Sequence, residues 1–443
     1  MSTMAIEVES KAYICPGEKH PISRSVHLAR LAAAFQACRE CPLRDDGARV
    51  AIRDVIVERA EEPRAPKREL FVTEGLRGAF LNAITRHVAD AVACKFAELV
   101  WERAPVRGPN DGIDRGAHRA RPTVVVGYDE RHSSPTIFAA AVAGLRRMGC
   151  HIVDIGLVTK PCFWFAVDHI HASGGLFVTG SGTEPALTGM DFLWEGARPA
   201  SAADLSNLQA AADHHDPQSR CATRPTRTAG VERTFQAAGP YEASLASRFA
   251  GIQLRKIACA SSSPLVGRIV QRLFKEMSCE LLYEDLPVKL RNPARRRDEA
   301  ILRLSSVVRD KQAQLGILID DDGQRCGFVD ERGRHVSPSA IARLVVPLLL
   351  AERPGSNVVL EPGALVELRP LIEAMGGRCQ TCHRDLGSIA AAVRDFRAVY
   401  GGGDSGRHWF LEGYANCDAF LVIGRALSAL NQTGQPFSQL AAT

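Results

Sequence analysis

Three short stretches of polar residues, each placed after an apolar run, could do chemistry. The first contains Ser181, which lies between Gly180 and Gly182 after the apolar run 176–178. Glycines on both sides let the backbone turn tightly and keep the hydroxyl out of a helix. A serine displayed in this way suits covalent chemistry if an activating group and a charge stabiliser lie nearby.

The second stretch is acidic. The apolar run 315–319 is followed by Asp320, Asp321 and Asp322, and Arg325 comes three residues later. Carboxylates at the carboxyl end of a buried parallel strand lie where α/β proteins bind ligands. Such oxygen ligands suit Mg²⁺, which pairs well with phosphate, and Arg325 could hold phosphate oxygens. The same residue types also form surface turns, but the strand before and the arginine after favour a site.

The third stretch follows a strand-like run at 397–400 and is rich in glycine. It contains Ser405, Arg407 and His408, whose side chains can bind hydroxyls or phosphate. Taken alone this signal is weak, because glycine-rich turns after strands are frequent.

A separate set of metal-ligand residues lies near the N-terminus. Cys15, His20, Cys38 and Cys41 form a Cys-x₄-His pair and a Cys-x₂-Cys pair, a spacing that suits tetrahedral Zn²⁺. His27 could replace His20 as the fourth ligand. Unrelated thiols in a short domain explain the pattern about equally well. An iron–sulfur cluster is disfavoured because only three cysteines are available.

The elements that must position these residues alternate between strands and helices from Leu70 onward. This alternation predicts tandem α/β units with largely parallel sheets. Predicted strands lie at 124–127, 152–155, 176–178, 256–260, 280–283, 315–319, 357–360 and 397–400. Predicted helices lie at 134–148, 162–170, 264–277, 338–352 and 365–375. Serine followed by proline marks two helix starts, at 134 and 337, and Pro370 should kink the last helix.

Composition places the domain boundaries. The charged, proline-containing stretch 61–68 is typical of a linker, and the Pro/Gly/Ser/Thr-rich segment 200–239 separates the first unit from the second. We therefore predict a small Cys/His module followed by three α/β units. Their ranges are 1–60, 69–205, 235–325 and 326–443.

Bulk properties exclude several classes of protein. The net charge of the 443-residue chain is only +5, so the overall charge gives no indication that the protein binds nucleic acid or an anionic membrane. No apolar run approaches the roughly 18–20 residues that span a bilayer, and the N-terminus lacks the layout of a secretory signal. Thirteen cysteines, an odd number, argue against a disulfide framework. We expect a cytoplasmic protein.

Together these stretches resemble the α-D-phosphohexomutase family, which includes phosphoglucomutases, phosphomannomutases and phosphoglucosamine mutases. The resemblance begins at 71–78, which is similar to the family's Phe-x-Thr-x-Gly-x-Arg-Gly, and continues at 127–134, similar to Gly-x-Asp-x-Arg-x-Ser. Several motifs in the right order and spacing carry it. It implies three tandem three-layer α/β/α domains, with the family's fourth domain absent.

The resemblance also implies a chemistry. A phosphorylated serine exchanges its phosphoryl group with a sugar monophosphate, and Mg²⁺ bridges that serine and three aspartates. By position Ser181 matches the phosphoserine, with Arg77 and Arg131 beside it to hold the phosphate. The implied Mg²⁺ ligands are Ser181, Asp320, Asp322 and Gln324. The implied substrate-binding residues are Arg325, Asp404, Ser405, Arg407 and His408.

This chain departs from the family pattern at four positions. Gly182 and Asp191 replace a histidine and a lysine that are the family's candidate acid/base and phosphate-contact groups. Gln324 replaces the third metal aspartate, and Gly403 replaces a sugar-binding glutamate. Two residues, Lys160 and His132, are candidate substitute bases, although a structural or solvent-facing role is expected for each. The likeness of 181–185 to the family's fourth-domain phosphate loop is read as coincidence, because 181–185 follows a first-domain strand.

We predict that the chain is a mutase-type isomerase that interconverts hexose 1- and 6-phosphates through Ser181 and Mg²⁺. The alternative is a catalytically degenerate family member that binds a sugar phosphate, or a protein partner through the N-terminal module. The identity of the hexose and the oligomeric state do not follow from the sequence.

Overall fold

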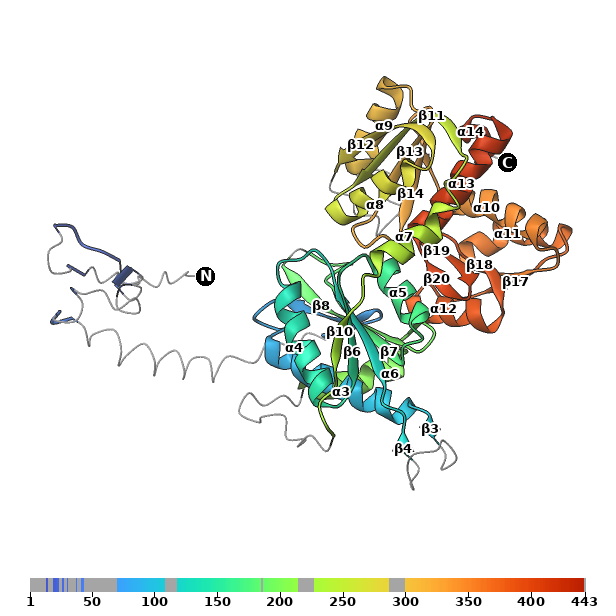
Figure 1. Ribbon diagram of the computed structural model, residues 1–443. Coiled ribbons are helices and arrows are strands. Elements are labelled where there is room, and N and C mark those ends of the chain that lie inside the picture. The colour runs from blue at the N-terminus through green and yellow to red at the C-terminus, as the bar shows by residue number, and fades with distance from the viewer. Residues whose placement is uncertain are drawn as a thin grey trace, which may run out of the picture. The chain divides into compact units, whose positions relative to one another are not determined.

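The computed structural model divides the chain into two compact units, Met1–Glu69 and Leu70–Thr443. It describes residues 70–107, 118–184, 186–213, 227–286 and 299–441, together with 13–14, 19–23, 26–27, 30, 37 and 41–43. In this part of the chain no helix is both long and apolar enough to cross a membrane. The second unit contains three large sheets, coloured blue to green, yellow, and orange to red along the chain (Figure 1), and one two-stranded sheet.

The first sheet carries the serine loop and has eight strands. Seven run in the order β1-β2-β8-β7-β5-β6-β10, and β9 pairs with β8. Their bounds are β1 Phe71–Val72, β2 Gly75–Ala79, β5 Thr123–Tyr128, β6 His151–Leu157, β7 Gly174–Val178, β8 Leu187–Trp194, β9 Arg198–Pro199 and β10 Glu232–Thr234. The helices of this part are α3 Arg86–Arg103, α4 Ser134–Arg147, α5 Lys160–His169 and α6 Ala202–Asp213, and β3 Val106–Arg107 and β4 His118–Arg119 form a separate hairpin.

The second sheet carries the acidic loop and has the order β12-β11-β13-β14-β15. Its strands are β11 Gln253–Ser261, β12 Ser278–Asp285, β13 Leu315–Ile319, β14 Cys326–Asp330 and β15 His335–Val336. The helices of this part of the chain are α7 Ala238–Ala246, α8 Pro264–Phe274 and α9 Glu299–Asp310.

The third sheet has the order β17-β16-β18-β19-β20. Its strands are β16 Asn357–Leu360, β17 Arg378–Thr381, β18 Ala398–Gly402, β19 His408–Glu412 and β20 Tyr414–Cys417. The accompanying helices are α10 Pro338–Glu352, α11 Pro362–Ala374, α12 Leu386–Asp395, α13 Ala419–Thr433 and α14 Phe437–Leu440.

The three sheets share one plan, and it places the three polar stretches at equivalent points. In each sheet a central strand pairs in parallel with the strand that precedes the polar stretch: β5 with β7, β11 with β13, and β16 with β18. The chain then turns and returns as an antiparallel neighbour, which is β8, β14 or β19. Each polar stretch is therefore the turn at the carboxyl end of a parallel strand, where α/β proteins place ligands.

The local signals of the sequence account for most of these elements. The predicted helix start at Ser337 is confirmed: its side chain caps α10 by accepting a hydrogen bond from the backbone N–H of Ala340, and Pro338 occupies the first turn. Helix α4 begins at Ser134, as predicted, and Ser133 occupies its N-cap position. The strand at 315–319 is observed with the predicted bounds.

Three expectations need correction. The segment 200–239 is not only a separator, because it contains α6 and β10; alanines and leucines make 202–213 a good helix. The predicted boundary at 325 would cut the antiparallel pair β13–β14, so residues up to Val336 belong to the second sheet. Helix α11 continues through Pro370, because Leu368 and Ile372 are fully buried and anchor both sides of the proline.

One hydrophobic core joins the three sheets. Phe177 on β7, Ile317 on β13 and Trp409 on β19 belong to the same cluster of buried side chains. The opposite face of β7 packs into a second cluster through Leu176 and Val178, as expected from the alternation of side chains along a strand. The shared core holds the three equivalent turns in fixed relation to one another.

Candidate active site

The serine loop joins β7 to β8 and presents a buried hydroxyl. Ser181 is 4% exposed, and its Oγ has no hydrogen-bond partner among the described residues. The loop is held by its own polar groups: the Ser181 N–H donates to Thr179 Oγ1 at 2.8 Å. Gly182 has φ +88°, in the left-handed region that favours glycine. The turn thus fixes the serine backbone and leaves its hydroxyl available.

Arg131 holds the serine loop by its backbone. Its guanidinium donates to the carbonyl oxygens of Glu184 at 2.7 Å, Leu187 at 2.9 Å and Thr183 at 3.1 Å. A Cβ at Gly180 would lie 2.6 Å from Arg131 Nε, which explains the glycine. Most of the donor capacity of Arg131 is therefore used in positioning the loop.

Arg77 lies on the other side of the loop and begins a chain of alternating charges. Its Nε donates to the Ser181 carbonyl oxygen at 3.2 Å, and its NH1 lies 2.6 Å from Asp191 Oδ1. The other carboxylate oxygen of Asp191 lies 2.7 Å from Lys160 Nζ, which in turn lies 3.6 Å from Glu74 Oε2. Burial of Arg77 alone would lower its pKa, but Asp191 raises it, so the guanidinium stays charged.

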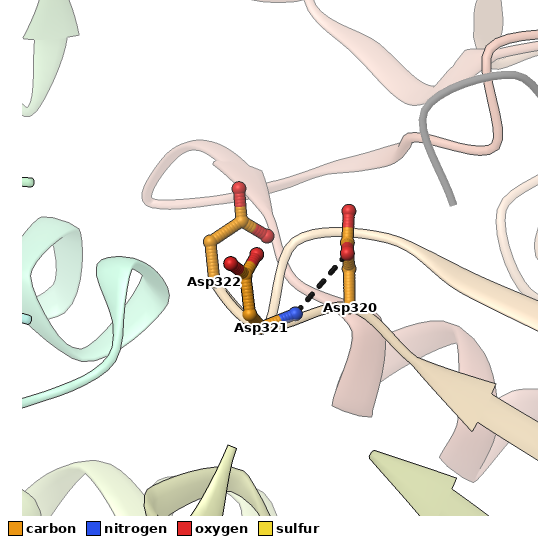
Figure 2. A group of neighbouring side chains, drawn as sticks. All are labelled: Asp320, Asp321 and Asp322. Carbon is orange, nitrogen blue, oxygen red and sulfur yellow. Dashed lines mark hydrogen bonds between the residues drawn. The ribbon is translucent and has the colours of Figure 1, made fainter. Parts of the chain in front are cut away.

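The acidic loop joins β13 to β14. Its three carboxylates project to the same side of the turn in Figure 2, and each offers an oxygen within 4.8 Å of the others. They belong to Asp320, Asp321 and Asp322. Among the described residues this is the one group of His, Cys, Asp and Glu side chains close enough to share a metal ion. The sequence argument left Asp321 out of the ligand set, although its position within the run was a sufficient signal.

The donor set fits a hard divalent cation. Asp320 and Asp322 are buried. Two cations lie near the run, with Arg325 NH1 3.7 Å from Asp320 and Arg131 NH2 4.0 Å from Asp321. Three adjacent carboxylates exceed those two charges, so a divalent cation would offset their repulsion. Gln324 is also buried, and its side-chain Oε1 and Nε2 have no hydrogen-bond partner in the described chain. Oxygen atoms of this kind are the ligands that Mg²⁺ prefers.

Glu74, in the turn between β1 and β2, forms ion pairs with cationic side chains from other parts of the chain. Its Oε1 forms a close ion pair with Arg407 NH2 and lies 3.9 Å from Arg325 NH2. Burial alone would raise the pKa of Glu74, but Arg407, Lys160 and Arg325 outweigh it and hold that pKa well below its ordinary value. Sequence reasoning missed Glu74, although it lies within the motif 71–78.

The third loop joins β18 to β19 and is held by Glu361, a second residue that sequence reasoning missed. Glu361, which directly follows β16, is fully buried, and its Oε2 accepts a hydrogen bond from the Ser405 N–H at 2.9 Å. A Cβ at Gly403 would lie 2.8 Å from Glu361 Cβ. Burial raises the pKa of Glu361. Its place at the end of an apolar strand was a usable signal.

The other residues of this loop have distinct surroundings. The Ser405 hydroxyl accepts from the Arg407 N–H at 3.3 Å, and Asp404 pairs with Arg384 at 3.1 Å. His408 is buried, with Nδ1 2.7 Å from the Tyr400 hydroxyl. Burial lowers the pKa of His408 to about 4, so its ring is neutral at neutral pH.

A cavity of about 580 Å³ brings the serine and acidic loops together. Ser181, Lys160, Asp321 and Asp322 line it, and α8 contributes its first turn. A backbone hydrogen bond ties the start of α5 to the acidic loop, because the Lys160 N–H donates to the Asp322 carbonyl oxygen at 3.3 Å. The volume suits a small polar ligand.

The structure describes only part of the candidate Zn²⁺-ligand set of the N-terminal unit. Cys15 and Cys38 lie outside the described residues; His20 is exposed and Cys41 is buried. His27, the alternative ligand, is buried with its ring stacked on Tyr13 at 4.2 Å between centroids. The Zn²⁺ site stays a prediction.

Comparison with known proteins agrees with this architecture. Residues 68–219 match the phosphoglucomutase/phosphomannomutase α/β/α domain I. The chain is 30% identical over 338 residues to a protein of Xanthomonas campestris pv. campestris strain B100 named phosphohexose mutases, with 74% of each chain covered. It is 24% identical over 384 residues to a phosphoglucomutase/phosphomannomutase of Thermococcus kodakarensis, covering 84% of this chain and 79% of that one.

A solved structure extends the likeness to the fold. The crystal structure of a phosphoglucomutase/phosphomannomutase family protein from Burkholderia thailandensis superimposes with a TM-score of 0.70 at 21% identity. The match covers 84% of this chain and 79% of the other. On the identity and coverage of its relatives, the chain belongs to the α-D-phosphohexomutase family of mutase-type isomerases.

Proposed function

We propose that this protein interconverts hexose 1- and 6-phosphates by phosphoryl transfer through Ser181. The observation that carries the proposal is the buried, unpartnered Ser181 hydroxyl in one cavity with the acidic loop. A hydroxyl held in this way can carry a phosphoryl group without first breaking a hydrogen bond. The cavity is large enough for a hexose phosphate beside it.

In the proposed reaction the bond from phosphorus to Ser181 Oγ breaks as a sugar hydroxyl oxygen bonds to phosphorus, and the proton of that hydroxyl ends on Ser181 Oγ. Such transfers depend mainly on positioning and on neutralising the charge of the phosphoryl oxygens. Arg131 and Arg77 position the loop through its carbonyl oxygens. Arg325 and Arg407, which converge on Glu74, are the cations proposed for a phosphate of the substrate.

Mg²⁺ is the cofactor that the acidic loop suits. We propose Asp320, Asp322 and Asp321 as its carboxylate ligands, with Gln324 offering a neutral oxygen and Ser181 completing the set. When bound, the ion would neutralise phosphoryl charge as a Lewis acid. In the third loop Asp404 and Ser405 are proposed to bind sugar hydroxyls.

Phosphorylation of Ser181 tests the proposal directly. The purified protein should carry one phosphate on Ser181 by intact-mass and peptide analysis, and should convert mannose 1-phosphate or glucose 1-phosphate to the 6-phosphate with Mg²⁺. Ser181→Ala should abolish both signals. Ser206→Ala, at an exposed serine of α6, is the matched control and should change neither.

An unphosphorylated Ser181 together with no Mg²⁺-dependent conversion would overturn the proposal. Binding of a sugar phosphate by that inactive protein, measured by calorimetry, would then support the alternative of a family member that binds without turnover.

A further inference from the structure

Lys160 is a buried lysine in the lining of the proposed phosphoryl site. It opens α5 directly after β6, is 1% exposed, and lines the same cavity as Ser181. Strands β5, β6 and β7 are parallel neighbours. Their carboxyl ends therefore bring Arg131, Lys160 and Ser181 to one edge of the sheet.

We propose that Lys160 is the cation that binds the phosphoryl group carried by Ser181, and that Asp191 holds its ammonium group in place. The inference rests on the proposed function, because it names the residue that neutralises the phosphoserine. Lys160 acts here by charge and hydrogen bonding, and no proton leaves it.

The balance of charge around Ser181 supports this role. Asp191 lies between two cations, with Arg77 NH1 at 2.6 Å and Lys160 Nζ at 2.7 Å. Within this group of three the cations exceed the carboxylate by one charge, and the next carboxylate, Glu74, lies farther from Lys160 Nζ, at 3.6 Å. A phosphoserine brings a charge of about −1.5 to −2 at neutral pH, and that charge fits the surplus.

Lys160 also contacts the acidic loop and the turn between β1 and β2. Its backbone N–H donates to the Asp322 carbonyl oxygen, and its Nζ lies 3.6 Å from Glu74 Oε2. A lysine that served only to neutralise Asp191 would need neither the cavity nor the second carboxylate. The ammonium group has three donors, so it can keep Asp191 and still bind a phosphoryl oxygen.

The identity of residue 191 agrees with the proposal. The family resemblance leads one to expect a lysine there, and this chain has Asp191 opposite Phe177 of β7. The carboxylate on β8 and the ammonium on α5 lie 2.7 Å apart. The site thus has a cation, which Lys160 on α5 supplies in place of the lysine expected at position 191 on β8.

Three variants test the inference. Lys160→Met should weaken the affinity for inorganic phosphate by about tenfold or more, as expected for loss of a charged hydrogen bond, and should lower the phosphorylated fraction of Ser181. Lys160→Arg should retain most of both. The double variant Lys160→Met with Asp191→Lys should recover both, because it returns the cation to β8.

The control is Lys256→Met on β11, outside the three polar loops. It breaks a lysine–carboxylate pair, because Lys256 Nζ lies 3.1 Å from Glu280 Oε2. Thermal unfolding of each variant separates folding from binding. Unchanged phosphate affinity and unchanged Ser181 phosphorylation in a folded Lys160→Met variant would overturn the inference while the proposed function stands. If wild-type Ser181 carries no phosphate and the protein shows no Mg²⁺-dependent conversion, the proposed function fails, and the ratio of phosphate affinities still decides the role of Lys160.

Discussion

Charged residues in the site alternate in sign from the serine loop to the third sheet. Arg77, Asp191, Lys160, Glu74 and Arg407 follow one another at ion-pair distances. Each of these charges is buried or nearly so, and a buried charge without a partner costs several kcal/mol. The order of signs therefore specifies the arrangement of the loops, because exchanging a cation with a neighbouring anion would bring like charges together.

Gln324 is the residue at which the metal site can be strengthened. Its buried amide lacks hydrogen-bond partners among the described residues, and it lies next to the aspartate run. Gln324→Asp adds a fourth carboxylate to the loop, and Mg²⁺ affinity rises with the number of ligand charges, by about tenfold here. Calorimetric titration of both proteins with Mg²⁺ measures the change.

Gln432→Asp, at an exposed position on α13, controls for the added charge and should leave Mg²⁺ affinity unchanged. Equal or weaker Mg²⁺ binding by Gln324→Asp would place residue 324 outside the metal site.

At the scale of elements, the sequence predicts those helices and strands that short-range signals determine. Runs of apolar residues indicated β13 and β16, and serine–proline pairs indicated the start of α10. The antiparallel return strand β14 was not predicted, because its pairing with β13 is set by the turn between them. The role of Arg131 was also inaccessible, since its partners are carbonyl oxygens more than fifty residues away.

The uninterrupted helix α11 offers a test at this scale. Pro370 is exposed in its interior and lacks the N–H that would bond to the carbonyl of Val366. Pro370→Ala restores that donor and should raise the free energy of unfolding by about 1–3 kcal/mol. Denaturant unfolding measures it.

Pro362→Ala in the first turn of the same helix is the control. No donor is needed there, so it should give no comparable gain. If Pro370→Ala left stability unchanged or lowered it, packing of Leu368 and Ile372 would be shown to depend on the proline.

At the scale of the molecule, the site depends on contacts between distant parts of the chain. Glu74 and Arg407 are 333 residues apart, and Tyr241 and Asp418 are 177 apart. Motif order located Ser181 and the acidic loop, because each belongs to one turn. The sequence indicates Lys160 as a candidate, but its pairing with Asp191, like that of Glu74 with Arg407, depends on the packing of segments far apart in the chain, which no local pattern encodes.

Asp418 links these parts and should make stability depend on pH. It is fully buried as the N-cap of α13, accepting from the Phe420 N–H at 2.8 Å and from the Tyr241 hydroxyl at 2.9 Å. The N–H of the next residue, Ala419, donates to the Gly323 carbonyl oxygen of the acidic loop. Burial raises the pKa of Asp418 to about 7, against about 3.9 in an unfolded chain.

Between these two pKa values the folded protein binds more protons at Asp418 than the unfolded protein does. This contribution to stability is full below about pH 4 and is lost as the pH rises through about 7. Asp418→Asn stays neutral, so its free energy of unfolding relative to wild type should increase from pH 5 to about pH 7 and level off above that. Urea unfolding at each pH, without Mg²⁺, measures the difference. Tyr241→Phe removes a hydrogen bond that favours the charged carboxylate, so it should raise the pKa of Asp418 further and extend the loss of stability to higher pH. Parallel curves for wild type and Asp418→Asn would show that Asp418 is charged in the folded protein throughout this range.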